Sequence, residues 1–274
     1  MVKKAPSKAE TLETGQDDEK ALLKEAYDVL QTTIGESDPK RRADIAQQAL
    51  VISRNCIEAW LMLAQDAAEN FEQSKEYLNQ AVEAGNRLFA LRMEEWKGKF
   101  WDIPETRPYM QARSAYAQIL WEIGERDEAV RIFRESLELN RTDPQGIRYI
   151  LLKAMLDDHR FQDAYDLIDS YDNEQSTVFL YGRLLAIFAL QGDSLMSRSA
   201  FLAARRHNVF VLDYLLNVRQ LPQKMPREAL PGDESEAIRY TAVFQNSWDD
   251  VDGAIDYLRK QKKLRQDKDA KKKR

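Results

Sequence analysis

The chain has 274 residues, of which 43% are hydrophobic and 32% charged, and its formal net charge is −5. This composition excludes a wholly disordered chain and is typical of a core-forming protein with one elongated domain or two small ones. The ten glycines and eight prolines are fewer than a protein of this size usually has. Turns are therefore scarce, which disfavours a many-stranded sandwich or barrel and predicts an all-α fold.

The first twenty residues, MVKKAPSKAETLETGQDDEK, are mostly polar and charged, and we predict a disordered N-terminal segment over 1–20. No apolar stretch follows the N-terminal lysines as it would in a signal peptide. No later apolar run approaches the roughly 18 residues that a membrane span needs. We therefore expect a cytoplasmic protein with no membrane partner.

Helical repeats are predicted from residue 21 to about residue 220. The phrase GERDEAVRIFRESLELN (Gly124–Asn140) reads as a turn followed by an amphipathic helix. Within it, Ala129 has counterparts at Ser74, Ala164 and Ser197, at successive intervals of 55, 35 and 33 residues. The last two intervals fit a helix-turn-helix unit of about 34 residues.

These phrases resemble the tetratricopeptide repeat (TPR) family. The block ALVISRNCIEAWLMLA looks like a junction between two such repeats, and Phe133 and Phe201 stand at the aromatic place of the second helix. Gly124 and Gly192 stand at the turn, whereas the corresponding DDHRF turn has no glycine. The resemblance implies an α-solenoid, in which antiparallel helix pairs stack, share a core and leave a concave surface lined by their first helices.

The interval of 55 residues exceeds one repeat by about 20, so we predict an insertion at about 84–113. Aromatic residues gather there beside arginines, lysines and two prolines. Two interpretations stay open. The aromatic side chains fill a wider gap between repeats, or Trp96, Trp101 and Tyr109 form an apolar hot spot in which Arg107 pairs with an acidic group of a partner.

A proline-bearing linker follows the repeats, and we predict a C-terminal helical cap at 221–258 that covers the last apolar face. Asp233 and Glu236 have the spacing of a capping box at the start of its helix. The phrases ETRPYMQAR, NVFVLDYLL and GDESEAIRY are similar to a TPR group related to the suppressor of tumorigenicity 7 family. That resemblance implies no catalytic chemistry.

The basic tail at 259–274 holds ten Lys or Arg and two Asp, a charge of +8, which leaves about −13 on the rest of the chain. An acidic body does not fit nucleic acid, so such a partner is expected through the tail alone. The tail has no aromatic residue for base stacking. It is either a solvated helix end or a contact with RNA or the ribosome.

Catalytic and metal chemistry lack the necessary residues. Cys56 cannot form an internal disulfide, and with His159 and His207 it does not make a Cys/His zinc site. The sequence contains no phosphate-binding loop, dinucleotide-binding or zinc-protease motif. We expect no enzyme activity, no cofactor and no metal.

The leading prediction is a noncatalytic TPR-type scaffold or adaptor that binds a peptide or protein segment in its concave groove or at the insertion. The alternatives are an RNA- or ribosome-associated protein that uses the basic tail, and a small-ligand receptor or enzyme with a site at the insertion. The sequence favours no particular oligomeric state.

The predicted first helices carry Gln65 and other glutamines, tryptophans and arginines on their surfaces. They lack the Lys and Asn residues that bind a C-terminal carboxylate in some TPR domains. Arginines recur there at intervals of 35 residues, as a basic stripe would. The candidate partner-binding residues are Trp96, Trp101, Arg107, Tyr109, Arg113, Gln118, Trp121, Arg148 and Arg183.

Overall fold

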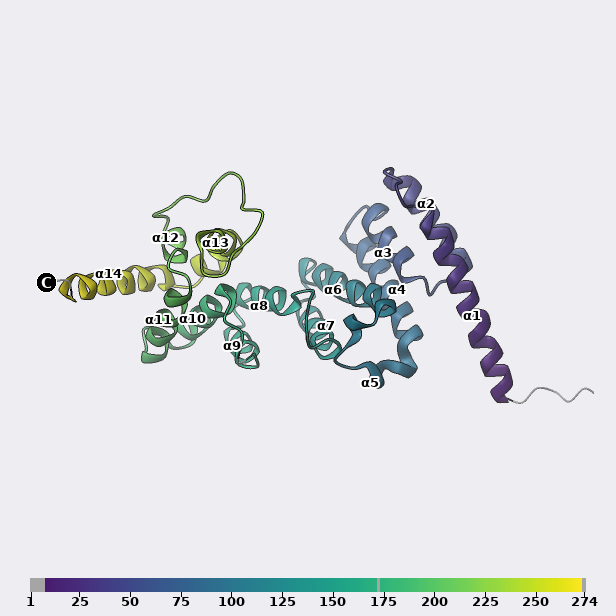
Figure 1. Ribbon diagram of the computed structural model, residues 1–274, viewed down its shortest axis with the longest axis horizontal. Helices are drawn as coiled ribbons and strands as arrows, with labels where there is room; N and C mark the ends of the chain where they lie inside the picture. The colour runs from purple at the N-terminus through teal and green to yellow at the C-terminus, as the bar shows by residue number, and fades with distance from the viewer. Residues whose placement is uncertain (1–7, 172, 273–274) are drawn as a thin grey trace, which may run out of the picture. The chain divides into compact units, whose positions relative to one another are not determined.

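The structure is a computed structural model that describes residues 8–171 and 173–272, with side chains described for 18–171 and 173–265. The described residues form helices, apart from loops and one isolated bridge between Lys99 and Asn140. The predicted all-α class is confirmed (Figure 1). Packing divides the chain into two compact units, unit 1 (Met1–Ile147) and unit 2 (Arg148–Arg274), so the division falls inside the range predicted as one repeat domain.

In unit 1, the longer helices pack in chain order: α1 on α2, α2 on α3, α3 on α4, α4 on α6, and α6 on α7. Helix α3 also contacts α6, so these two helices are neighbours on one side of α4. The helices are α1 (Lys8–Gln31), α2 (Pro39–Ile52), α3 (Ile57–Asp66), α4 (Phe71–Phe89), α5 (Met93–Trp96), α6 (Arg107–Glu122) and α7 (Arg126–Leu139).

Helix α1 begins at Lys8, within the segment 1–20 that the sequence predicts to be disordered; residues 1–7 lie outside the described residues. Its second half explains why a helix forms there. Ala26 and Leu30 are buried in the core that α1 shares with α2 and α3, and Asn55 donates a hydrogen bond to the Glu19 side chain. Packing of the apolar stripe thus supports a helix that its polar first half would not form alone.

Local signals set the helix boundaries in unit 1. Helix α2 starts with Pro39 at its first position, where proline is favoured, after Asp38, whose side chain accepts a hydrogen bond from the Lys40 amide at 3.0 Å. Asn70 caps α4 by accepting from the Gln73 amide at 2.9 Å. The buried face of α2 consists of alanines, which let the neighbouring helices approach closely.

Unit 2 is organised around α10, which packs on α9, α11, α13 and α14; helix α12 packs on α13 and α14. The helices are α8 (Ile147–Asp157), α9 (Phe161–Asp169), α10 (Thr177–Gln191), α11 (Leu195–His207), α12 (Val211–Leu215), α13 (Glu234–Asp249) and α14 (Ala254–Lys272). Tyr181, Phe201, Tyr240 and Trp248 are among its buried aromatic residues, and Trp248 Nε1 donates to the Tyr240 hydroxyl at 2.8 Å.

The segment predicted as a cap contains α13, and this helix begins after Asp233, whose carboxylate accepts from the amides of Ser235 and Glu236 at 2.8 and 3.2 Å. Glu236 does not complete the reciprocal half of a capping box. Its carboxylate instead accepts from the Gly232 amide at 2.7 Å, from Asn208 Nδ2 at 3.1 Å and from the Thr177 amide at 3.2 Å. Glu236 therefore joins α13 to the start of α10 and the end of α11.

Three of the four residues that carry the repeat pattern are buried, whereas Ser74 on α4 is only partly buried. Ala129, Ala164 and Ser197 are fully buried on α7, α9 and α11. The turns before these helices need a left-handed residue: Gly124 has φ +88° and Gly192 has φ +64°. In the turn without glycine, His159 also has a positive φ, of +57°.

Within the described part of the chain, none of the helices is both long and apolar enough to cross a bilayer.

Candidate functional site

A groove of about 440 Å³ lies on unit 1 and is lined by α3, α4 and α6; we call it the α3–α6 groove. Three glutamines contribute its amide groups, Gln65 from α3 and Gln111 and Gln118 from α6. Leu61, Leu78 and Ile119 supply apolar surface, and the small residues Ala64, Ser74 and Ala115 complete the lining. The lining residues carry no charge.

The spacing of residues on α6 explains the shape of the groove. Gln111, Ala115 and Gln118 recur every three or four residues, which places them on one face of the helix. The small side chain of Ala115 between the two amides leaves the groove open. Gln118 Nε2 donates to the backbone oxygen and to Oγ of Ser114, both at 3.2 Å, which holds its amide against α6.

The groove brings together Gln118, a predicted site residue, and Gln65, which the sequence places on a first-helix surface. Gln111 and Ala115 were missed by the sequence analysis. The three-and-four spacing back from Gln118 is the signal that identifies them.

The aromatic insertion forms a packed cluster. The ring centroid of Phe89 lies 6.2 Å from that of Trp96, 6.2 Å from that of Phe100 and 5.7 Å from that of Tyr109. Phe100 and Tyr109 are fully buried, whereas Trp96 is partly buried. This geometry fits the interpretation in which these aromatic side chains fill the space between α4 and α6.

Arg107 lies at the surface of the insertion, and Trp101 is partly buried against the same cluster. Arg107 is exposed, its Nε donates to the backbone oxygen of Trp101 at 3.0 Å, and its guanidinium carbon lies 5.9 Å from the Trp101 ring centroid. The Trp101 amide donates to Asn140 Oδ1 at 3.2 Å. This pair is the part of the predicted hot spot that a partner can reach.

Tyr109 and Arg113 differ from the expectation of a partner-binding surface, because both are buried. Arg113 is 6% exposed and donates to Glu135 Oε2 at 2.7 Å, Ser136 Oγ at 3.0 Å and the Tyr109 hydroxyl at 3.2 Å. The guanidinium is thus held between α6 and α7. We assign these two residues to packing within unit 1.

The other two arginines of the predicted stripe also have acidic partners. In unit 2, Arg148 pairs with Glu174 at 3.0 Å and lies over the Tyr149 ring at 4.3 Å. Arg183 pairs with Asp169 at 3.3 Å. These arginines are therefore neutralised within their own unit, which weakens the interpretation of a basic stripe for an acidic partner.

Trp121 is a partly exposed residue near the end of α6, and the guanidinium of Arg126 lies 5.3 Å from its ring centroid. It lies one helical turn beyond Gln118. A cation over an aromatic face stabilises the pair modestly and leaves the ring edge accessible.

The cysteine and the histidines have structural positions. Cys56 is fully buried at the start of α3, and burial raises the pKa of its thiol to about 12. A thiol in this environment stays protonated and unreactive. His159 is exposed in its left-handed turn, and His207 Nε2 lies 3.4 Å from Glu236 Oε2. The described residues contain no group of three or more side chains suited to hold a metal ion.

The basic tail begins as part of α14 and is tied to unit 2 by ion pairs. Lys260 Nζ lies 2.7 Å from Asp193 Oδ2, and Lys262 Nζ lies 2.6 Å from Asp213 Oδ1. Hydrogen bonds from Arg198 and Lys260 lower the pKa of Asp193 to about 2. The remaining basic side chains, from residue 266 onward, lie outside the described side chains.

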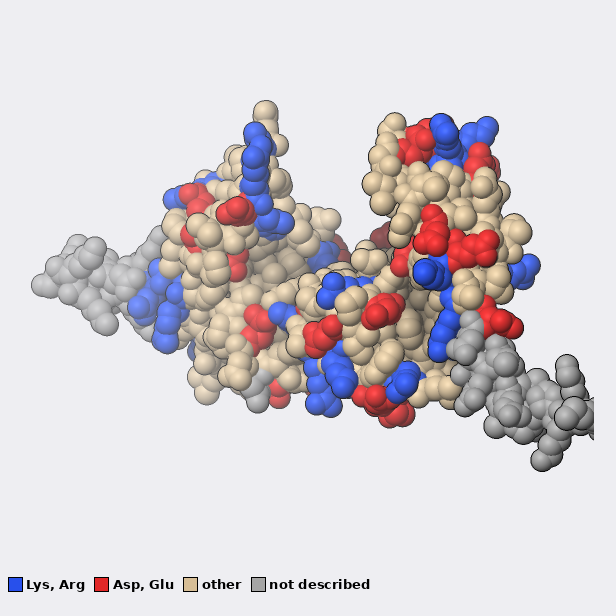
Figure 2. Space-filling view, turned by 45° about the vertical axis from the view of Figure 1, so that its right-hand side comes forward, with Lys and Arg blue, Asp and Glu red and all other residues tan. Residues whose placement is uncertain are grey.

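Surface charges of both signs lie next to one another over the face drawn in Figure 2, in keeping with the many surface ion pairs of each unit.

Comparison with known proteins identifies the family. A family model described as ST7 protein matches residues 8–264. Similar curated proteins include an ST7 homolog of Drosophila melanogaster, 24% identical over 262 residues, covering 86% of this chain and 48% of the relative. Another is a human suppressor of tumorigenicity 7 protein-like protein, 23% identical over 262 residues, covering 86% of this chain and 45% of the relative.

The chain spans about half the length of these curated relatives. Because the family model matches nearly the whole chain, the protein belongs to the ST7 family.

Proposed function

We propose that the chain is a noncatalytic scaffold of the tetratricopeptide type that binds an extended peptide segment of a partner protein in the α3–α6 groove. The groove carries the proposal, because it combines amide side chains with apolar surface between two neighbouring first helices. In TPR-like solenoids, first helices line the concave face on which partners bind.

The TPR assignment is supported by the order of packing and by the positions of the repeat residues. Three pairs of consecutive helices pack together: α3 with α4, α6 with α7, and α10 with α11. Ala129 and Phe133 on α7 are buried, as are the corresponding Ser197 and Phe201 on α11. Small and aromatic residues at these places let second helices interlock with the following pair.

The chemistry of the groove suits a peptide backbone. A glutamine amide both donates and accepts hydrogen bonds, so Gln65 and Gln111 can pair with the amide and carbonyl groups of an extended chain. Gln118, whose Nε2 already donates to Ser114, offers its oxygen as an acceptor. Leu61 and Leu78 supply apolar contact area for alternate side chains of the peptide. Since the lining has no charge, we expect an affinity that changes little with salt.

A peptide library displayed on phage and selected on the full chain tests the proposal. The selected peptide is labelled, and its Kd is measured by fluorescence anisotropy at low and high salt. We expect Gln65→Ala combined with Gln118→Ala to weaken binding about thirtyfold, since two lost hydrogen bonds of about 1 kcal/mol each cost about 2 kcal/mol together.

The matched control is Gln47→Ala combined with Gln48→Ala, two exposed glutamines of α2, which should leave Kd unchanged. A Trp101→Ala variant tests the insertion as the contact surface instead. Equal affinity of the groove variant and the wild type would contradict the proposal.

Deletion of 266–274 tests the RNA alternative with a labelled single-stranded RNA. Binding that disappears on this deletion and weakens steeply with salt would place the contact in the basic tail. On our proposal, the deletion leaves peptide binding unchanged.

A further inference from the structure

A second and larger cavity, of about 680 Å³, lies in unit 1 beside α1 and α3, and we call it the α1 cavity. Its walls come from α1, α3, the end of α4 and the insertion. Leu23, Leu30, Met62, Leu88 and Phe89 are among the apolar side chains. The volume lies within the range of about 300 to 1,000 Å³ that is usual for small-molecule sites.

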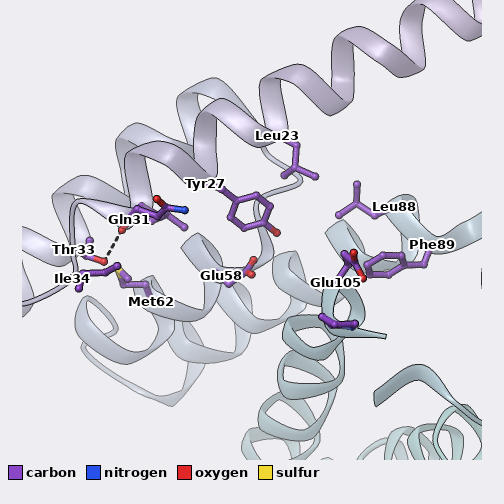
Figure 3. A pocket seen from close by; sticks show the side chains of 12 residues that line it. Leu23, Tyr27, Gln31, Thr33, Ile34, Glu58, Met62, Leu88, Phe89 and Glu105 are labelled. Carbon is purple, nitrogen blue, oxygen red and sulfur yellow. Dashed lines mark hydrogen bonds between the residues drawn. The ribbon is translucent and has the colours of Figure 1, made fainter. Parts of the chain in front are cut away.

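The charged residues that line the cavity are two glutamates, and none of the lining residues is basic. Its twelve lining residues include Glu58 and Glu105 and no Lys, Arg or His. Figure 3 shows Tyr27 projecting from α1 toward Glu58 on α3, with Glu105 on the far side near Leu88 and Phe89. An apolar cavity with this charge favours a cation over a neutral or anionic ligand.

Glu58 has a carboxylate oxygen, Oε2, that is buried without a hydrogen bond among the described residues. Burial raises the pKa of Glu58, although the nearby Tyr27 hydroxyl acts to lower it. A buried carboxylate without a cationic partner is costly, and a bound ammonium group would remove that cost.

We propose that the α1 cavity binds a small apolar molecule that carries a protonated amine, with the ammonium group at Glu58 and the apolar part against Leu23, Met62 and Leu88. This site is separate from the α3–α6 groove and does not depend on peptide binding there. Leu88, Phe89, Pro104 and Glu105 belong to the predicted insertion, so the insertion supplies one wall of the site.

The probes are 4-phenylbutylamine, the matched alcohol 4-phenylbutan-1-ol and the matched acid 4-phenylbutanoate. Isothermal titration calorimetry on the full chain measures each Kd. We expect the amine to bind at least about tenfold more tightly than the alcohol, which corresponds to about 1.4 kcal/mol, and the acid to bind more weakly than the alcohol.

Glu58→Gln should abolish the preference for the amine while alcohol binding is kept. Glu25→Gln, on the exposed face of α1, is the matched control and should keep the preference. Met62→Trp fills the cavity and should abolish binding of all three probes. Circular dichroism of each variant establishes that it is folded.

Amine binding should also strengthen as pH rises and release protons, because the ammonium group favours the ionised form of Glu58. The titratable groups facing Glu58 are Tyr27 from α1 and Cys56 at the start of α3, and Glu105 lines the same cavity. Calorimetry in buffers of different ionisation enthalpy counts the protons.

Equal affinities for the amine and the alcohol, or a preference that survives Glu58→Gln, would overturn the proposal. The glutamine variants of the α3–α6 groove should leave amine binding unchanged, so the two proposals fail independently.

Discussion

At the scale of single residues, close contacts decide which positions tolerate change. Gly85 on α4 lies directly against the ring of Tyr109, and a Cβ atom at this position would overlap the ring atoms. Tyr109 cannot move away easily, because it is fully buried and its hydroxyl is bonded to Asn86 and Arg113. The glycine is what lets α4 and α6 approach.

We expect Gly85→Ala to lower the free energy of unfolding by about 2 kcal/mol or more, although alanine is the better helix former. Urea unfolding followed by circular dichroism measures the change. Gly182→Ala on α10 is the control, since its Cβ would lie 3.1 Å from Leu152 Cδ2, a side-chain tip that can shift. An equal effect of the two substitutions would contradict this account.

Sequence patterns predicted the positions of some single residues. The burial of Ala129 and Phe133 followed from helical spacing, and the turn at Gly124 was predicted as well, but not its backbone conformation. The pairing of Arg113 with Glu135 could not be predicted, because the two residues lie 22 positions apart on different helices. Their contact depends on the crossing of α6 and α7, which no local pattern specifies.

At the scale of elements, Glu236 connects α13 to the rest of unit 2. Burial acts to raise the pKa of its carboxyl, but hydrogen bonds from Gly232, Thr177 and Asn208 outweigh burial, and the pKa is lowered. The carboxylate therefore stabilises unit 2 at pH values above the ordinary carboxyl pKa. This stabilisation is lost as pH falls through the lowered pKa, when the folded protein takes up the proton.

We expect Glu236→Gln to lower the free energy of unfolding by about 2 kcal/mol at neutral pH, since an amide nitrogen would face backbone donors that the carboxylate now accepts from. The difference from the wild type should shrink in acid. Urea unfolding at neutral and acidic pH measures it. Glu228→Gln, at an exposed loop position, is the control and should have no effect.

The α3–α6 groove and the α1 cavity differ in how far the sequence predicts them. Repeat spacing places Gln65 and Gln118 on first helices, so two residues of the groove could be predicted from the sequence. The α1 cavity combines residues from Leu23 to Glu105, which come from separate helices and from the insertion. Because α1 carries no repeat pattern, its position over α3 follows from packing alone.

At the scale of the whole molecule, the chain consists of two compact units, each with its own buried core. Unit 1 contains the groove, the cavity and the aromatic cluster. Unit 2 contains the segment predicted as a cap and the start of the basic tail. A unit with its own core is expected to fold without the other.

We expect the separate fragments 1–147 and 148–274 each to give a helical circular dichroism spectrum and a cooperative thermal transition. Packing within each unit supplies the apolar burial that cooperativity requires. The full chain, melted under the same conditions, is the reference. A fragment that stays unfolded would show that its stability depends on the other half.

The burial of Cys56 makes the chain its own reporter of local opening. This single thiol is fully buried in the core that α1, α2 and α3 share and stays protonated, so an alkylating reagent reacts with it when that part of unit 1 opens. Where alkylation is faster than reclosing, its rate gives the opening frequency of this region, and where it is slower, the rate gives the population of the open form. Unit 2 contributes no competing signal, because it contains no cysteine.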